Sequence, residues 1–308
     1  MAEDILMKSD ATAIMGAESE VELAAARAPW FKALANWVRH QPLGAASAVA
    51  VVLMILVAIF APQIAPYDPV NNHYESMELA PSAEFWLGTD QFGRDLLSRV
   101  IWGARTALFI GFTSAILGST LGLVLGVASA YFAGWFDLLF QRVMDVFLAF
   151  PLIIMALAVV AIFGTGAEHV IIAITIPFVP RCARVVRSSA LAIREIPYVD
   201  AARALGFGHM RIILRHMVPN CMAAYLIMLT TFLGQAILLE ASLSYLGLGV
   251  QEPTPAWGLM LQGGAEEYAE SAPWIAIFPG LAITLAVFAF NLFGDAVRDT
   301  FDPKLRAR

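Results

Sequence analysis

Long stretches without any charged residue alternate with shorter polar segments along the chain. A helix needs about 20 apolar residues to cross a hydrocarbon core of about 30 Å. Six uncharged stretches are candidates, running from Leu43 to Ala61, Thr106 to Phe136, Val146 to Phe163, His169 to Pro180, Cys221 to Leu239 and Ser271 to Gly294. The pattern therefore predicts an all-α integral membrane protein with six transmembrane helices.

Two of these stretches are unusual in length. The fourth is short and contains Pro177 and Pro180, so we expect a kinked helix that uses the residues after Pro180 to complete the crossing. The second is longer than a straight crossing requires, and we expect it to tilt or to project beyond the membrane. It carries Gly118, Gly122 and Gly126 on one face, a spacing that lets another helix approach closely. That helix belongs either to this chain or to a partner subunit.

The segments outside the spans also have a predictable character. Residues 1–28 are polar, alanine-rich and acidic, which is typical of a disordered tail. Residues 29–42 place apolar side chains at helical spacing, which predicts an interfacial amphipathic helix leading into the first span. In the outer segment from Pro62 to Arg105, Asp90 can cap a helix that lies at the outer surface before the second span. Residues 43–308 are expected to form a single transmembrane domain.

The composition agrees with a membrane protein, because 59% of the residues are hydrophobic and only 14% are charged, against roughly 25% in soluble domains. Acidic residues precede the first span where a signal peptide would be basic, so we expect this span to be retained as an anchor. The net charge of −6 gives no support to nucleic-acid binding. Cys182 and Cys221 have no metal or redox spacing and are expected to be packing residues.

The positive charges are unevenly divided between the two sides of the predicted spans. Of the 19 lysines and arginines, all but Arg94, Arg99 and Arg105 fall in the terminal segments and in alternate loops. Loops rich in lysine and arginine stay on the cytoplasmic side of a membrane. We therefore expect both termini in the cytoplasm, together with the loop of about residues 190–219 that joins the fourth and fifth spans.

This loop has the pattern of two short amphipathic helices. Pro197 is well placed as the first residue of a helix, and Gly206 can adopt the left-handed conformation that ends it. Pro219 is expected to stop the second helix. At helical spacing, the first predicted apolar face contains Tyr198, Ala201, Ala202 and Leu205, and the second contains Met210, Ile213, Leu214 and Met217.

Helices of this length are marginal on their own in water, so each apolar face needs a surface to pack on. One interpretation is that the faces pack on each other and on the membrane helices, while the arginines only fix the topology. The alternative is that one face, ringed by residues such as Arg211 and Arg215, is offered to a soluble partner protein.

The spacing of Asp200, Ala201, Ala202, Gly206 and Pro219 resembles the EAA loop of permease subunits in binding-protein-dependent ABC importers, with Asp200 where that family has Glu. Four further segments are similar to the C-type permease of the dipeptide, oligopeptide and nickel group. They read LGTDQFGRDLLSRVIWGARTAL, DVFLAFP, EASLSYLGLGVQEPTPAWG and NLFGDAVRDTFDP. Together with the loop, they are distributed over most of the chain.

The resemblance implies the fold of a type I ABC importer permease in the bacterial inner membrane. It also implies a homologous permease subunit, two ATPase subunits or domains, and a periplasmic or surface binding protein that delivers the substrate. Peptides are the implied cargo, and nickel complexes, glutathione and other small solutes remain open.

The resemblance also assigns roles to two groups of residues. Those expected to contact or orient the ATPase are Asp200, Ala201, Ala202, Leu205, Gly206, Met210, Arg211 and Pro219. Those expected at the binding protein or an outer gate are Arg94, Asp95, Arg99, Glu252 and Trp257. For the second group, structural capping is an equally good explanation.

The chain lacks the residues that nucleotide hydrolysis needs. A phosphate-binding P-loop requires a lysine directly after glycine, and none of Lys8, Lys32 and Lys304 follows one. We therefore expect no enzyme activity, cofactor or metal site in this chain, with ATP and Mg²⁺ on partner ATPase subunits. The alternative function is ion-gradient-driven secondary transport, which usually needs ionisable residues within the spans. The candidates lie near the predicted span ends: His169, Glu240 and Asn291.

Overall fold

The computed structural model describes residues 37–301 of the chain. In this range the regular secondary structure is helical, apart from one isolated bridge between Thr89 and Asp95. The chain divides into two compact units, Met1–Ala45 and Ala46–Arg308, and the description below concerns the second. The predicted tail and the part of the predicted interfacial helix before Trp37 lie outside the described residues.

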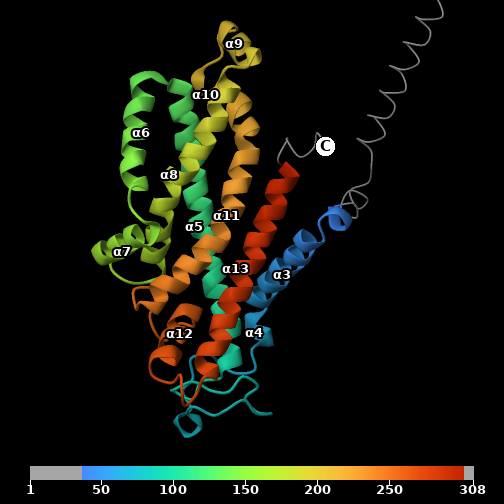
Figure 1. Ribbon diagram of the computed structural model, residues 1–308, viewed down its shortest axis with the longest axis vertical. Helices are drawn as coiled ribbons and strands as arrows, with labels where there is room; N and C mark the ends of the chain where they lie inside the picture. Colours follow the sequence, from blue (N-terminus) through green and yellow to red (C-terminus); the bar gives the residue numbers. More distant parts are fainter. Residues whose placement is uncertain (1–36, 302–308) are drawn as a thin grey trace, which may run out of the picture. The chain divides into compact units, whose positions relative to one another are not determined.

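Long helices joined by short turns make up most of the second unit (Figure 1). Loops at residues 65–95 and 246–256 lie at one end of these helices, and α9 with α10 lies at the other. The α-helices in chain order are α3 (Pro42–Ile59), α4 (Ala61–Ile64), α5 (Leu96–Phe132), α6 (Gly134–Leu148), α7 (Leu152–Phe163), α8 (Ala167–Arg194), α9 (Pro197–Ala204), α10 (His209–Ile212), α11 (Val218–Tyr245), α12 (Trp257–Glu266) and α13 (Trp274–Phe301). A short 3₁₀ helix spans Tyr74–Ser76, and a π-helical turn spans Ile213–Met217.

Five helical segments are long and apolar enough to cross a membrane: α3, α5, α8, His209–Tyr245 and α13. The count reaches six when α6 and α7 are taken as one crossing, and these two helices are bent by 91° where they meet. The predicted all-α membrane fold is confirmed, but the third predicted span is broken rather than straight. Pro151 lies at the break, where its ring and missing N–H prevent a continuous helix.

The second span begins earlier than predicted. α5 starts at Leu96, and its N-cap is Asp95, whose side chain accepts a hydrogen bond from the Ser98 amide at 2.8 Å. The prediction of a separate surface helix capped by Asp90 is wrong, because the helix that starts at Leu96 continues without a break into the span. α8 likewise continues through Pro177 and Pro180 to Arg194, so the fourth span is longer than its uncharged core.

Glycine allows α5 and α8 to approach closely. A Cβ at Gly118 would lie 2.6 Å from the Phe178 Cβ, and one at Gly122 would lie 2.5 Å from the Cys182 Cβ. A Cβ at Gly126 would lie 2.6 Å from the Ala183 carbonyl oxygen. The glycine face predicted from the sequence therefore packs against a helix of this chain.

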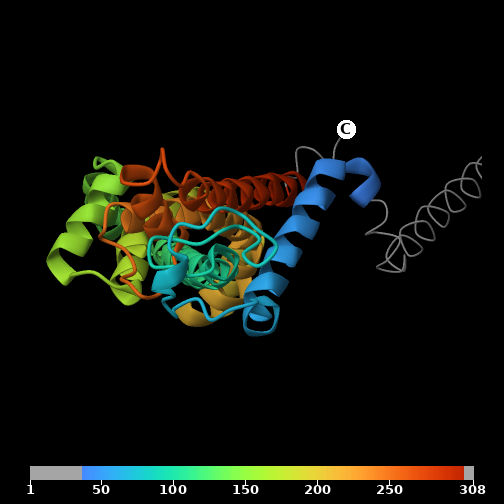
Figure 2. The same ribbon diagram turned by 90° about the horizontal axis from the view of Figure 1, so that it is seen from below.

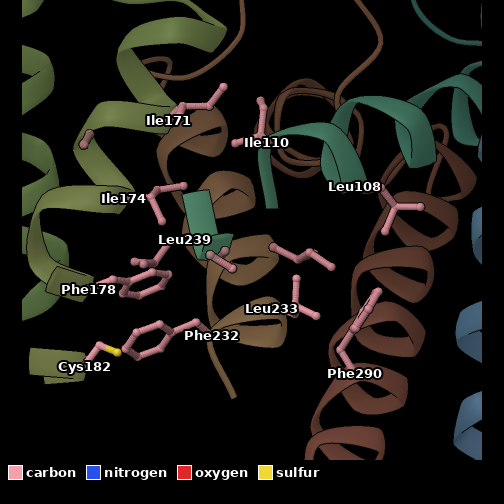
Figure 3. Close-up of a cluster of buried hydrophobic side chains, with 14 of the residues drawn as sticks. Leu108, Ile110, Ile171, Ile174, Phe178, Cys182, Phe232, Leu233, Leu239 and Phe290 are labelled. Carbon is pink, nitrogen blue, oxygen red and sulfur yellow. The ribbon is translucent and has the colours of Figure 1, made fainter. Parts of the chain in front are cut away.

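The core forms where α5, α8, α11 and α13 meet (Figure 3). The rings of Phe178 on α8 and Phe232 on α11 stack with their centroids 4.1 Å apart. Cys182 and Cys221 are fully buried, as expected for packing residues. In the view from below, α13 and the α6–α7 pair lie on different sides of α5 (Figure 2).

Large apolar side chains remain exposed on the outward faces of several helices. Examples are Trp135 and Leu138 on α6, Ile162 on α7 and Phe288 on α13. Soluble monomers rarely expose so many large apolar side chains. Lipid or further membrane helices are the surroundings that suit these faces.

Candidate functional site

The segment after α8 forms two short helices joined by a glycine turn. Pro197 is the first residue of α9, where its missing N–H is harmless. Gly206 has φ of +75°, and the space around its Cβ position is empty. The predicted helix start at Pro197 and the predicted left-handed turn at Gly206 are confirmed.

α9 buries only a small part of its predicted apolar face. Val199 and Ala202, three residues apart, are buried, whereas Tyr198, Ala201 and Leu205 are exposed. Of the predicted face, only Ala202 therefore packs inside the unit. A helix of only eight residues buries a narrow stripe, and Val199 belongs to the stripe that faces the rest of the unit.

The second half of the segment is also rotated from the prediction. Ile212 and Met217 are buried, and Met210 and Leu214 are exposed. Pro219 does not stop the second helix, which was the prediction, because the chain passes through the π-helical turn directly into α11. In that turn the Val218 amide donates to the Ile213 carbonyl, and the wider winding accommodates a proline in the first turn of α11.

Polar contacts attach α9 and α10 to the long helices. The Tyr131 hydroxyl on α5 is 2.7 Å from Nδ1 of His209 at the start of α10. The Arg203 guanidinium lies 5.4 Å from the centre of the Tyr131 ring. On the other side, the Tyr198 hydroxyl donates to the His216 carbonyl at 3.0 Å and accepts from Asn220 at 3.0 Å. The base of the segment is thus fixed to both α5 and α11.

The tip of the segment is exposed. We call Ala201, Leu205, Met210 and Arg211 the tip surface. Leu205 is 73% exposed and Met210 is 67% exposed, and the Arg211 guanidinium lies 4.1 Å from the centre of the Phe207 ring. Exposed apolar side chains next to arginine are typical of a surface that binds another protein. The buried residues fit the interpretation that the loop packs on the membrane helices, and binding of a soluble partner by the exposed residues stays a prediction.

Further ion pairs tie α6 to α8 below the tip surface. Arg187 pairs with Asp137, its Nε donating at 2.7 Å, and Arg184 pairs with Asp145. These pairs connect the bent α6–α7 segment to the helix that leads directly into α9. α8, which leads into α9, is therefore attached to α6 by polar contacts.

The opposite end of the helices contains a network of four charged residues. Arg94 donates to Asp90 at 2.7 Å and to Glu252 at 2.7 Å, and Arg99 lies 3.5 Å from Asp90 and 3.3 Å from Glu252. The Arg99 side chain is 1% exposed and also donates to the Pro69 carbonyl. The network joins the loop before α5 to the loop after α11.

The charge state of Arg94 follows from these contacts. Burial by itself lowers its pKa, but the hydrogen bond from Arg94 to Glu252 and the charges of Asp90 and Glu252 together raise the pKa above the ordinary value. Arg94 therefore stays charged, and its side chain is held by two carboxylates.

The remaining two predicted outer residues have structural contacts. Asp95 caps α5, and the Trp257 Nε1 donates to the Val100 carbonyl at 2.9 Å. Trp257 packs against Gly103, where a Cβ would lie 2.5 Å from the indole ring. All five predicted outer residues thus lie near the start of α5, and only Glu252 is exposed. Contact with a binding protein stays a prediction for this group.

Residues 37–301 contain no group of three or more His, Cys, Asp or Glu residues placed to hold a metal ion. What the described residues offer is an exposed tip surface at one end, a charged network at the other, and long helices between them.

Residues 118–307 match the family described as binding-protein-dependent transport system inner membrane component. Residues 28–81 match the family described as N-terminal TM domain of oligopeptide transport permease C. The chain belongs to this permease family. It is a multi-pass membrane subunit of a bacterial ABC importer and is not itself an enzyme.

Relatives of this permease align over nearly their whole length. The glutathione transport system permease protein GsiD of Escherichia coli O157:H7 is 41% identical over 295 residues, which cover 96% of this chain and 97% of the relative. A protein of Brucella suis biovar 1 (strain 1330), provisionally named a peptide transport system permease protein, is 45% identical over 258 residues, 84% of this chain and 86% of the relative.

Solved structures share the fold of the permease. Two crystal forms of the inward-facing MetNI methionine ABC transporter superpose with TM-scores of 0.53 and 0.54, at 20% and 18% identity. They cover 66% and 67% of this chain and 96% and 98% of the other. The predicted type I ABC importer fold is confirmed.

Sequence reasoning missed several residues that position the permease's tip surface. Val199 carries the buried face of α9, and Tyr131 with His209 forms the attachment to α5. Asp90 was predicted as a helix cap, whereas it pairs with Arg94 and Arg99. The roles of Val199 and Tyr131 could not be predicted from the sequence, because both depend on contacts between helices that are distant in the sequence.

Proposed function

We propose that this permease imports peptides and forms half of the translocation pathway together with a homologous permease subunit. A binding protein delivers the peptide at the end that carries the loops of residues 65–95 and 246–256. ATPase subunits or domains drive transport from the end that carries α9 and α10. The names of the relatives support this cargo, since one is named for glutathione, itself a tripeptide, and another for peptides.

The exposed tip surface is the observation that carries the proposal. Leu205 and Met210 project from a short helical segment whose base is anchored to α5 through His209 and to α11 through Tyr198. An apolar anchor surrounded by polar residues suits a groove in a partner protein. A force on Leu205 is transmitted to the long helices through contacts that are short and polar.

In this function the permease lies in the inner membrane, with the tip surface and both termini in the cytoplasm. ATP and Mg²⁺ are bound by the partner ATPase subunits. Support comes from the distribution of lysine and arginine between alternate loops and from the lack of a lysine after glycine anywhere in the sequence.

Purification of the complex from native membranes tests the proposal. The chain is tagged in the wild type, in Leu205→Asp and in Leu79→Asp, which places the same charge on an exposed leucine of the opposite end. We expect a second permease and P-loop subunits to copurify with the wild type and Leu79→Asp. We expect Leu205→Asp to lose most of the P-loop subunits and the ATPase activity of the eluate.

Two results would count against this function. Purification of the wild-type chain without any P-loop subunit would favour ion-gradient-driven secondary transport, tested in vesicles with imposed proton and sodium gradients. Equal recovery of ATPase with Leu205→Asp and Leu79→Asp would show that the tip surface is not where the ATPase binds.

A further inference from the structure

A pocket of about 880 Å³ opens beside the charged network, at the start of α5. Its walls come from four places: residues 68–70, the α5 face that carries Trp102, Arg105, Thr106 and Phe109, the first residues of α8, and residues 250–255. Pockets that bind small ligands are typically about 300–1,000 Å³ in volume. The pocket therefore has the size of a small-molecule site and lies at the end opposite to the tip surface.

The charged residues that line the pocket fall into two classes. The negative charge of Glu252 is balanced by Arg94 and Arg99, which both donate hydrogen bonds to it. Asp68 and Arg105 have no such partner, because neither forms an ion pair with any of residues 37–301. The pocket therefore presents one unpaired negative group and one unpaired positive group, separated from each other.

Arg105 lines the pocket near the start of α5, and its side chain is exposed. The centre of the Trp102 ring lies 5.6 Å from its guanidinium carbon. An exposed guanidinium without a carboxylate partner is available to bind an anionic group. Asp68 lies on the loop of residues 68–70, which also lines the pocket, and one of its carboxylate oxygens accepts from the Val70 amide.

The rest of the lining is mainly apolar, with Trp102, Phe109 and Val250 among the larger side chains. Thr106, Gln251 and Thr254 add neutral hydrogen-bonding groups. A ligand that suits this lining has a cationic end, an anionic end and neutral or apolar groups between them. A short peptide with free termini has this chemistry.

We propose that this pocket binds a peptide in its zwitterionic form, with the α-carboxylate at Arg105 and the α-ammonium group at Asp68. The planar guanidinium can donate two parallel hydrogen bonds to the carboxylate. The peptide side chains pack on Trp102 and Phe109. The inference rests on the proposed function, since it names where the permease itself contacts the imported peptide after release from the binding protein.

Direct binding to the purified complex, in nanodiscs and without binding protein, tests the site. The probes are labelled trialanine, its C-terminal amide and its N-acetyl derivative. We expect Arg105→Gln to weaken the binding of trialanine by at least about tenfold and to leave the binding of the amide unchanged. We expect Asp68→Asn to weaken the binding of trialanine to a similar extent and to leave the binding of the N-acetyl derivative unchanged. Arg142→Gln, an exposed arginine at the other end, is the matched control.

The outcomes separate this site from the proposed function. Uptake of trialanine by cells, driven by ATP and requiring the binding protein, reports the function independently of the pocket. If uptake occurs but the wild-type complex binds no trialanine, or if Arg105→Gln weakens all three probes equally, the pocket is not a peptide site. Absence of ATP-driven peptide uptake in the wild type would contradict the proposed function itself.

Discussion

Gly122 determines how closely α5 and α8 approach. Its Cα faces Cys182 so directly that a Cβ would come within 2.5 Å of the Cys182 Cβ and 3.0 Å of the Ala183 amide. The spacing of Gly118, Gly122 and Gly126 was sufficient to predict a close approach from the sequence. It could not identify α8 as the neighbour, because a glycine face specifies the distance of a contact and not its partner.

Gly122→Ala should therefore destabilise the permease by about 1–3 kcal/mol, since the helices must move apart to admit one methyl group. Thermal unfolding of the purified complex in detergent measures this as a lower midpoint. Gly280→Ala is the control, because a Cβ there would have only the Leu261 side chain nearby, at 3.7 Å. Equal midpoints for the two variants would contradict the close packing of α5 on α8.

For the outer network, the sequence indicated the residues but not their contacts. Arg94, Arg99 and Glu252 could be selected from the sequence as candidates at one end of the molecule. Their pairing with each other and with Asp90 could not be predicted, because it depends on how two loops separated by more than half the chain fold together.

Arg94→Met should destabilise the permease by about 3–5 kcal/mol, because it leaves Asp90 buried without its closest partner. The abundance of the variant in membranes and its unfolding midpoint report the loss. Arg142→Met removes an arginine whose side chain is 74% exposed, and it should change stability by no more than about 1 kcal/mol. A stable Arg94→Met variant would show that the network contributes little to the fold.

At the scale of elements, some features of α9 and α10 follow from local sequence rules, and others depend on packing. Pro197 and Gly206 follow rules of helix starts and left-handed turns, and both were predictable from the sequence. The buried stripe of α9 and the passage through Pro219 into α11 were not, because the first depends on the surface that α9 meets and the second on a π-helical turn.

Gly206→Val should leave insertion intact and reduce ATP-driven uptake several-fold, because a β-branched residue disfavours φ of +75° and displaces Leu205. Gly208→Val is the matched control, since Gly208 has φ of −66° and open space around it. Uptake and abundance are measured in the same cells. Normal uptake with Gly206→Val at normal abundance would show that transport does not depend on the conformation of this turn.

At the scale of the whole molecule, hydrophobic length was enough to predict a helical membrane protein and most of its spans. It failed where proline interrupts the pattern, between α6 and α7. The two candidate sites lie at opposite ends of the described unit: the tip surface lies where α8 leads into α9, and the charged network and pocket lie where α5 begins. The long helices connect these two ends.

Crosslinking from Leu205 tests the central claim, that the tip surface binds an ATPase subunit. Cys182 and Cys221 are buried, so Leu205→Cys and the control Trp86→Cys, 70% exposed at the other end, introduce accessible thiols. We predict that a short thiol-reactive crosslinker joins Leu205→Cys to a P-loop subunit in native membranes, and that Trp86→Cys gives no such product. Crosslinking of the P-loop subunit to Trp86→Cys, or to neither variant, would contradict the account.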